Sequence, residues 1–271
     1  MPENDLLKRA IAQLNSTSST IEATSITHVD RLKVAVCGEP KTGKSNIIAR
    51  TARKPLLHYD FDDRKESIAG MEDVVIKTLF DLKDLEPKAW GIFESDIGTL
   101  EYMKSQNTLP FKSIALDSCT FLRKYAEHQF MKDSSSSSRA KFKIGTTDYI
   151  IPKDWDAVTG VQKMLEGVLS RLFALDVDVY MTFHTRPEKD QQKSTKTETV
   201  YKDNLTVEPP NLKMLLPKFN DCWRTFVDTD GKFKVQLKPD WKFGASTVFK
   251  NVGDTEEADI QKLLEKHNGR K

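Results

Sequence analysis

The segment Gly38–Ser45 constrains this chain more than any other stretch. Its sequence, GEPKTGKS, fits the pattern G-x-x-x-x-G-K-[ST] of a phosphate-binding P-loop. The apolar residues 32–37 predict a short strand that leads into it, and residues 46–51 predict the start of an amphipathic helix. A strand, a glycine turn and a helix in this order wrap backbone N–H groups around phosphates. A chance match in an ordinary turn is the alternative, and the strand and helix on either side argue against it.

The P-loop predicts a nucleoside triphosphate, ATP, and Mg²⁺ as ligands. Lys44 is expected to contact the β- and γ-phosphates, and the Ser45 hydroxyl to hold Mg²⁺. The residues expected to bind the nucleotide are Gly38, Glu39, Pro40, Lys41, Thr42, Gly43, Lys44, Ser45 and Asn46.

A second apolar segment, residues 112–118, predicts a strand that ends in an acid, as in a Walker B motif. Asp117 is expected to complete the Mg²⁺ shell opposite Ser45. A typical AAA+ protein or helicase has Glu directly after this Asp, whereas this chain has Ser118. The N-K-x-D motif with which small GTPases read their base is also absent. The catalytic carboxylate is therefore expected elsewhere.

The acids at residues 60–63 are the main candidates for that carboxylate. They follow a predicted strand at residues 56–59, and ligands of parallel α/β sheets bind at the carboxyl ends of strands. Asp62 and Asp63 are both candidates for the group that activates water. A solvated turn with ordinary charges is the alternative, because loops at strand ends are polar in any case.

A third predicted strand, residues 176–183, ends at His184. A polar residue at this strand tip is placed to sense the γ-phosphate. A histidine that only satisfies its own hydrogen bonds is the alternative.

Two polar segments are candidates for contact with nucleic acid. A serine run that is expected to be mobile precedes Arg139, Lys141 and Lys143, and these basic residues are interleaved with aromatic residues such as Phe142 and Tyr149. Lysines suit the phosphates of a single strand and rings suit its bases. A solvated surface loop is the alternative. Residues 185–203 form a second long polar segment whose charges nearly balance, and loops of this length are functional or disordered.

The remaining pattern predicts an α/β fold with three parts. Residues 1–30 are expected to form an N-terminal helix and a Ser/Thr-rich linker, which packs either on its own core or on a neighbouring subunit. Residues 31–253 are expected to form the ATPase core, with paired strands near its end. Residues 254–271 are expected to form a C-terminal helix and tail.

Composition narrows the class of protein. The 271 residues include 42 Lys and Arg against 40 Asp and Glu, which excludes a histone-like polycation but permits a local basic groove. Three cysteines without C-x-x-C spacing favour a reduced compartment. Neither a signal peptide nor an apolar run long enough to span a membrane is apparent, so we expect a soluble cytoplasmic protein with no membrane partner.

Taken together, these motifs resemble the phage-encoded RecA-like ATPases of the single-strand annealing group, the Sak-type branch of the AAA_24 P-loop family. The resemblance covers about residues 32–249. It rests on the P-loop, the acids at residues 60–63, the strands ending at Ser118 and His184, and residues 209–224, which lead into the last predicted hairpin.

The resemblance implies a RecA-like core, a mostly parallel β-sheet flanked by helices with a C-terminal antiparallel hairpin. It also implies a homo-oligomer, a ring or a filament, with ATP between subunits and single-stranded DNA on inner loops. Asp62 takes the position where such proteins usually have a Glu, so its side chain is one carbon shorter. The implied DNA loops span about residues 134–152 and 186–205. They contain Arg139, Lys141, Lys143, Arg186, Lys189 and Lys193.

Such subunits also offer a cation to a neighbour's γ-phosphate, and here Lys242 or Lys250 would supply it. We therefore expect an ATPase that binds single-stranded DNA in phage recombination or annealing. A P-loop protein that uses ATP as an assembly switch for a protein partner, such as a helicase loader or a packaging accessory, is the alternative. A small-molecule kinase is less well supported, because Arg186 alone stands for the Arg-rich lid of such enzymes.

Overall fold

The computed structural model describes residues 31–79, 88–134, 139–144, 147–152, 155–189 and 201–269. All of these belong to one compact unit, Arg31–Lys271. The expected N-terminal arm, residues 1–30, and the candidate Lys193 lie outside the described residues.

In the described part of the chain, nine strands form one mixed sheet with the order β11-β10-β9-β1-β7-β4-β2-β3, and β8 pairs with β7. Six of them run parallel, and β8, β10 and β11 are antiparallel to their neighbours. The strands are β1 (Lys33–Gly38), β2 (Leu56–Asp60), β3 (Val74–Thr78), β4 (Ser113–Asp117), β7 (Asp178–Lys189), β8 (Tyr201–Glu208), β9 (Asp221–Val227), β10 (Phe233–Gln236) and β11 (Thr255–Glu257). A smaller hairpin joins β5 (Arg139–Ile144) to β6 (Thr147–Pro152).

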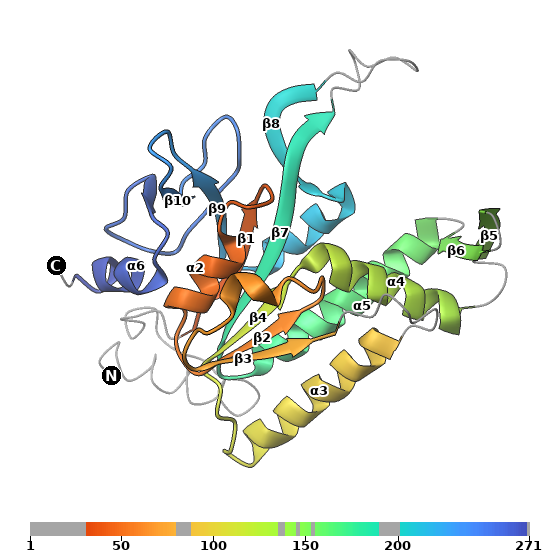
Figure 1. Ribbon diagram of the computed structural model, residues 1–271. Helices are drawn as coiled ribbons and strands as arrows, with labels where there is room; N and C mark the ends of the chain where they lie inside the picture. Colours follow the sequence, from red (N-terminus) through yellow and green to blue (C-terminus); the bar gives the residue numbers. More distant parts are fainter. Residues whose placement is uncertain are drawn as a thin grey trace, which may run out of the picture. The chain divides into compact units, whose positions relative to one another are not determined.

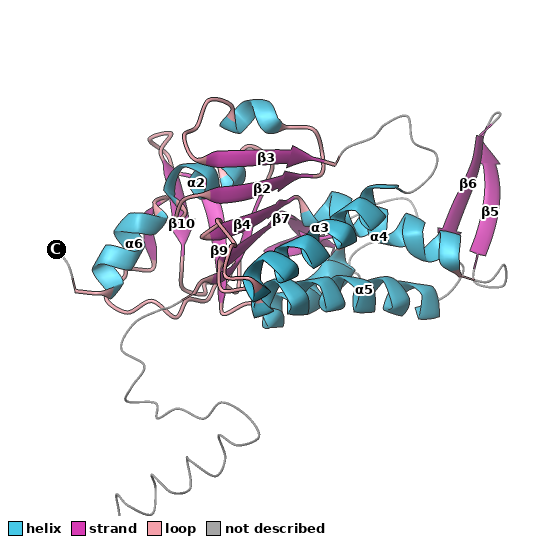
Figure 2. Cartoon of the chain, turned by 90° about the horizontal axis from the view of Figure 1, so that it is seen from below, coloured by secondary structure: helices cyan, strands magenta, loops and turns pink. Residues whose placement is uncertain are grey.

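Three long helices, α3 (Lys88–Ser105), α4 (Cys119–Asp133) and α5 (Trp155–Ala174), pack against one another beside the sheet, as Figures 1 and 2 show. The P-loop helix α2 (Lys44–Thr51) contacts the C-terminal helix α6 (Ile260–His267) and the 3-10 helix η2 (Lys65–Ile68). A second 3-10 helix, η4 (Pro210–Lys218), precedes β9. None of the helices in these segments combines the length and apolar character that a membrane span requires.

The central strands divide their residues between two faces with a period of two. Alternate apolar side chains, such as Leu116 on β4 and Met181 on β7, join one core cluster with α3, α4 and α5. The residues between them therefore face the other side of the sheet, where α2 lies. The polar residues that this alternation places on the α2 side are His58, Asp60, Asp117, Thr182 and His184. One face of the sheet is thus apolar core, and the other carries the polar groups of a site.

The buried carboxylate of Asp178 lies at the start of β7, at the end of the strands that is away from the P-loop. It accepts hydrogen bonds from the Leu32 backbone N–H at 2.8 Å and from Arg53 Nε at 2.7 Å. The start of β7 is therefore tied both to the segment before β1 and to the segment after α2. These contacts stabilise the amino-terminal ends of the strands, and the site lies at their carboxyl-terminal ends, beside the P-loop.

The predicted fold class is confirmed, because the sheet is mostly parallel, helices flank it and antiparallel strands close its C-terminal side. The structure differs from the sequence-based expectation in the two polar segments. The residues after the serine run, expected to lie in a loop of about residues 134–152, form the β5–β6 hairpin, in which Phe142 pairs with Tyr149; residues 135–138 of the run lie outside the described residues. Alternating aromatic and β-branched residues favour such pairing.

The long polar segment at residues 185–203 also differs from expectation. Its beginning continues β7 to Lys189, and its end belongs to β8 from Tyr201. The C-terminal helix is shorter than expected, since residues 255–257 extend the sheet as β11 before α6 starts at Ile260.

Candidate nucleotide-binding site

The P-loop connects β1 to α2 with its lysine folded back onto the loop. Lys44 Nζ donates to the backbone oxygens of Gly38 at 2.9 Å and Glu39 at 2.8 Å. Burial lowers the pKa of Lys44 to about 8, against the opposing effect of Asp117. Lys44 and Gly38 are buried, and Thr42, Gly43, Ser45 and Asn46 are half-buried; Glu39, Pro40 and Lys41 are exposed at the turn.

Two glycines of the motif are required by their surroundings. A Cβ atom on Gly38 would lie 2.4 Å from Thr225 Oγ1, a hydroxyl that also contacts Thr42 Oγ1 at 2.8 Å. Gly43 precedes α2 with φ of 84°, a backbone conformation that favours glycine. The P-loop therefore lies directly against β9, which carries Thr225.

Asp117, at the end of β4, is the most strongly bound carboxylate of the site. Its Oδ1 accepts a 2.5 Å hydrogen bond from Thr182 Oγ1, and its Oδ2 lies 3.5 Å from His58 Nε2. Burial raises the pKa of Asp117, but hydrogen bonds from His58, Ser45 and Thr182 outweigh burial and bring it to about 2. Asp117 is therefore an anion at neutral pH, and its contact with Ser45 brings the two expected Mg²⁺ ligands together.

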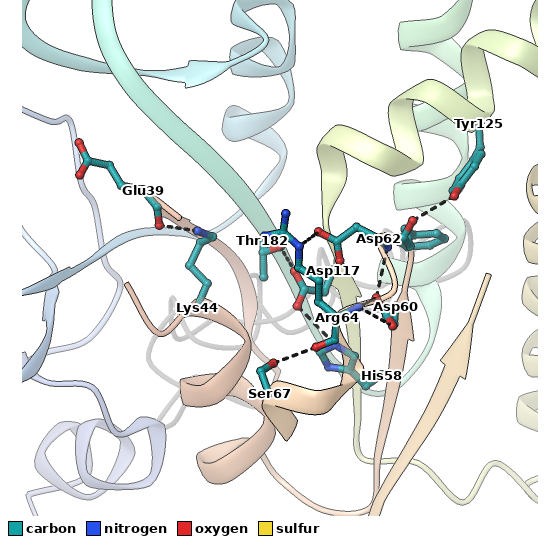
Figure 3. Close-up of polar contacts among 11 residues, drawn as sticks. Glu39, Lys44, His58, Asp60, Asp62, Arg64, Ser67, Asp117, Tyr125 and Thr182 are labelled. Carbon is teal, nitrogen blue, oxygen red and sulfur yellow. Dashed lines mark hydrogen bonds and ion pairs between the residues drawn. The ribbon is translucent and has the colours of Figure 1, made fainter. Parts of the chain in front are cut away.

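The three acids at the end of β2 and directly after it have different roles in the structure. The Asp60 carboxylate is buried and accepts the backbone N–H groups of Asp62 and Arg64, so it holds the loop in shape. Asp62 turns inward, with a side chain that is 4% exposed and 3.3 Å from Arg64 Nε. Asp63 points to solvent and pairs with Lys65 at 3.0 Å. Figure 3 shows Asp62 and Asp117 on the same side of the sheet.

The two inward carboxylates have widely separated pKa values. Burial and the negative charge of Asp117 raise the pKa of Asp62 to about 7, while Arg64 acts in the opposite direction. Asp117 stays near 2. Two acids whose pKa values are separated in this way can have two different roles, since one remains ionised and the other exchanges a proton near neutral pH.

His184 lies where β7 passes the P-loop, paired in register with Gly38. Burial, followed by the charge of Lys44, lowers the pKa of His184 to about 4, so the imidazole is neutral at pH 7. Its Nδ1 atom is buried and has no hydrogen-bond partner among the described residues. A neutral, half-buried imidazole beside the phosphate loop suits a contact to a phosphate oxygen or to water.

The acid loop is also tied to the helix that follows Asp117. The Tyr125 hydroxyl on α4 donates to the Phe61 backbone oxygen at 3.0 Å, next to Asp62 (Figure 3). The same helix continues toward the β5–β6 hairpin and packs against β6. The loop that carries Asp62 and the β5–β6 hairpin therefore both contact α4.

The structure separates the predicted DNA contacts from the phosphate site. Arg139, Lys141 and Lys143 occupy alternate positions of β5, and Arg186 and Lys189 lie on β7 beyond His184. Arg186 is exposed. The first set belongs to the β5–β6 hairpin, which comes after Asp117 and α4 in the sequence. The second set belongs to the β7–β8 hairpin, which continues from His184.

The two candidate trans lysines lie in different places. The backbone oxygen of Lys242 accepts from Leu205 N on β8 at 2.7 Å, beside the hairpin that extends past His184. The backbone N–H of Lys250 instead donates to His267 Nδ1 at the end of α6. Lys242 is thus held next to the β7–β8 hairpin, whereas Lys250 is held at the far end of α6, the helix that packs against α2.

Four residues of the site were not predicted from the sequence. His58 and Thr182 contact Asp117, Arg64 pairs with Asp62, and Tyr125 holds the acid loop. The spacing of His58 from Asp60, two positions along one strand, was a usable signal because such residues share a face. The Arg64–Asp62 pair is local, within one loop. The contacts of Thr182 and Tyr125 join segments that are distant in sequence, and no local pattern marks them.

Comparison with known families identifies the class of protein. The AAA_24 family, described as an AAA domain, matches residues 30–209, and the chain therefore belongs to this family. It is a P-loop ATPase domain that binds nucleotide. A comparison with curated proteins gave no match.

Among solved structures, the chain is similar to a KaiC-like protein, PH0186, from the hyperthermophilic archaeon Pyrococcus horikoshii OT3. The two share 9% sequence identity with a TM-score of 0.41, over 83% of this chain and 88% of the other.

Proposed function

We propose that this chain is a Mg²⁺-dependent ATPase with a RecA-like core that binds single-stranded DNA in phage recombination or strand annealing. The observation that carries the ATPase assignment is the pair of inward carboxylates in front of the P-loop. Asp117 has a pKa of about 2 and Asp62 a pKa of about 7. The ionised acid suits a metal ligand and the other suits a proton acceptor.

The residues present fit Mg²⁺, because the Ser45 hydroxyl and the Asp117 carboxylate are hard oxygen ligands in mutual contact. When bound, Mg²⁺ would neutralise charge on the β- and γ-phosphates. Thr182 and His58 hold the Asp117 carboxylate in one orientation for this purpose.

In the proposed reaction, Lys44 exchanges its bonds to Gly38 and Glu39 for bonds to phosphate oxygens. Water attacks the γ-phosphorus, the bond from that phosphorus to the bridging oxygen of ADP breaks, and the Asp62 carboxylate accepts the proton of the water. His184, being neutral, donates or accepts a hydrogen bond at the γ-phosphate without adding charge.

Support for single-stranded DNA comes from the two hairpins and from the family resemblance. Arg139, Lys141 and Lys143 occupy every second position of β5, and alternate positions of a strand share one face. The pairing of β7 with β8 begins at His184, so the β7–β8 hairpin is continuous with a residue of the phosphate site. Backbone phosphates are the sequence-independent ligands of such basic strips.

Steady-state ATP hydrolysis, measured with and without single-stranded and double-stranded DNA, tests the proposal. We expect stimulation by the single strand and loss of hydrolysis in Lys44→Ala. Hydrolysis without any effect of DNA would support the assembly-switch alternative instead.

A triple variant, Arg139→Ala with Lys141→Ala and Lys143→Ala, tests the DNA site. Removing three phosphate contacts is expected to reduce the slope of log affinity against log salt by about 2. The matched control removes three lysines at the amino-terminal edge of the sheet, Lys54, Lys104 and Lys112, which precede or contact the starts of β2, β7 and β4. An unchanged slope in the first variant would contradict the assignment of this hairpin.

A further inference from the structure

We propose that the nucleoside half of the nucleotide, its base and sugar, binds in a pocket between α2 and β10, with Phe233 as the surface on which the base stacks. This inference rests on the proposed function and adds the part of the site that contacts the base. It concerns a region on the opposite side of β1 from Asp117.

The pocket has a volume of about 260 Å³ and begins at the P-loop. One wall is the face of α2 that carries Gly43, Asn46 and Arg50, residues spaced three and four apart on a helix. The opposite wall is formed by Phe233 on β10 and by Asp259, which begins α6. The volume is below the range of pockets for drug-sized ligands, which suits a ring and a sugar but not a whole nucleotide.

The direction in which a nucleotide must lie follows from the strand order. Asp117 ends β4 and Asp62 follows β2, and both strands lie on one side of β1, beyond β7. β10 lies on the other side of β1, beyond β9. The γ-phosphate and the base are at opposite ends of an extended molecule. A nucleotide with its γ-phosphate toward Asp117 and Asp62 therefore directs its base toward β10.

Phe233 is the residue best placed to receive that base. Its side chain is 50% exposed, and its Cδ1 atom lies 2.8 Å from the position of a Cβ on Gly43. The ring thus lies on the P-loop itself while part of it faces solvent. A single exposed aromatic residue is ordinary on a surface, but here its ring borders a pocket that opens from the phosphate loop.

Some polar side chains of the pocket already form hydrogen bonds or ion pairs, and others do not. Asp259 caps α6 by accepting from Lys262 N at 3.1 Å, and Lys262 Nζ pairs with Glu257 at 2.6 Å. The side chains of Asn46 and Arg50 make no hydrogen bond or ion pair with any other residue in the described segments. An amide and a guanidinium are therefore available for sugar hydroxyls or for the α-phosphate. Stacking itself is tolerant of base identity, so we expect weak discrimination among bases.

Calorimetric titration of the full chain with Mg²⁺–ATP and with Mg²⁺–tripolyphosphate tests the inference. Tripolyphosphate carries the phosphates without base or sugar. We expect Phe233→Ala to weaken ATP binding by about 5- to 150-fold, the range typical for loss of one base–aromatic stack. Its affinity for tripolyphosphate should be unchanged. Phe233→Trp should keep ATP binding.

Two further variants separate stacking from simple support of the loop. Phe233→Leu keeps an apolar side chain against Gly43 but removes the ring face, and should weaken ATP binding as Ala does. Tyr102→Ala removes an exposed aromatic side chain on α3, away from the pocket, and serves as the matched control.

The outcomes distinguish this inference from the proposed function. Equal ATP affinity in the wild type and in Phe233→Ala would overturn the inference and leave the ATPase assignment intact. Equal losses for ATP and tripolyphosphate would also overturn it, since Phe233 would then only hold the P-loop. Failure of the wild type to bind either ligand would instead overturn the proposed function.

Discussion

Thr182 on β7 and Asp117 on β4 are joined by a 2.5 Å hydrogen bond from a hydroxyl to a carboxylate, across two adjacent parallel strands. The register places Leu116 opposite Met181, so the next residue of each strand turns to the α2 side. Hydrogen bonds to an ionised acceptor are short and strong. This bond fixes the carboxylate that is expected to bind the metal, and so it should control metal affinity.

Replacing Thr182 by Val should weaken Mg²⁺ binding and ATP hydrolysis by about 10- to 100-fold, the usual effect of removing a group that orients a metal ligand. The reason is that Asp117 would lose one of the three hydrogen bonds that keep it ionised. Titration of hydrolysis against Mg²⁺ concentration measures the effect, and Thr182→Ser should restore it.

The matched control for this change is Thr185→Val. Thr185 is equally buried on the same strand, but its hydroxyl has no hydrogen-bond partner in the part of the chain described by the structure. A Mg²⁺ dependence that shifts equally in both variants would show that burial of a hydroxyl, and not the bond to Asp117, is responsible.

The rate of hydrolysis should depend on pH through Asp62. Its pKa of about 7 means that the carboxylate is protonated below pH 7 and accepts no proton there. We expect kcat to fall about tenfold per pH unit below 7 and to level off above it. Asp62→Asn should bind ATP but not hydrolyse it, whereas Asp63→Asn should behave as the wild type because Asp63 faces solvent.

Arg64 gives a second test of the same group. Its positive charge lowers the pKa of Asp62, so Arg64→Ala should move the midpoint of the pH–rate profile to higher pH. The effect on folding has a defined sign as well. Folding raises the pKa of Asp62 from 3.8 to about 7. Its contribution to stability is therefore present below about pH 4 and is lost as pH rises to about 7. Chemical unfolding between these pH values should show this decrease in the wild type and not in Asp62→Asn.

Tyr125→Phe should uncouple DNA binding from hydrolysis. This variant removes only the hydroxyl that holds the Phe61 backbone oxygen, and the ring that packs on the core remains. We expect basal hydrolysis and DNA affinity to stay close to those of the wild type, while stimulation by single-stranded DNA falls. A variant that is stimulated as fully as the wild type would show that the link between α4 and the acid loop carries no signal.

Of the two candidate trans cations, Lys242 is expected to act on a neighbour's nucleotide. Lys242→Ala should lose hydrolysis in the oligomer, and Lys250→Ala should keep it, because Lys250 is attached to α6. Mixing Lys242→Ala with Lys44→Ala in equal amounts should restore about a quarter of the activity, since one in four head-to-tail interfaces then joins an intact site to an intact cation. No recovery on mixing would argue for action within one subunit.

The sequence allowed much of the site to be predicted because its key residues end apolar strands. Lys44, Asp117 and the acids after β2 follow recognisable local patterns, and parallel strands bring their carboxyl ends to one edge of a sheet. The same reasoning placed His184 beside the P-loop, where it pairs with Gly38. It left open which acid faces inward, and in the structure Asp62 does so, because the Asp60 carboxylate holds the loop.

Contacts between distant segments could not be predicted in this way. No local pattern shows that β7 lies between β1 and β4, so the bond from Thr182 to Asp117 was not foreseen. The proximity of Phe233 to Gly43 likewise depends on the pairing of β10 with β9. The β5–β6 hairpin was missed because the serine run before it suggested a mobile segment, although the residues that follow alternate as strands do.

The extension of β7 from the sheet core past His184 to Lys189 has a mechanical consequence (Figure 1). At about 3.3 Å per residue, the five steps from His184 to Lys189 form an arm of about 17 Å. A tilt of about 10° where His184 meets the phosphates would move the far end of that arm by about 3 Å. A tilt of this kind would convert the state of a single phosphate into a displacement at the hairpin.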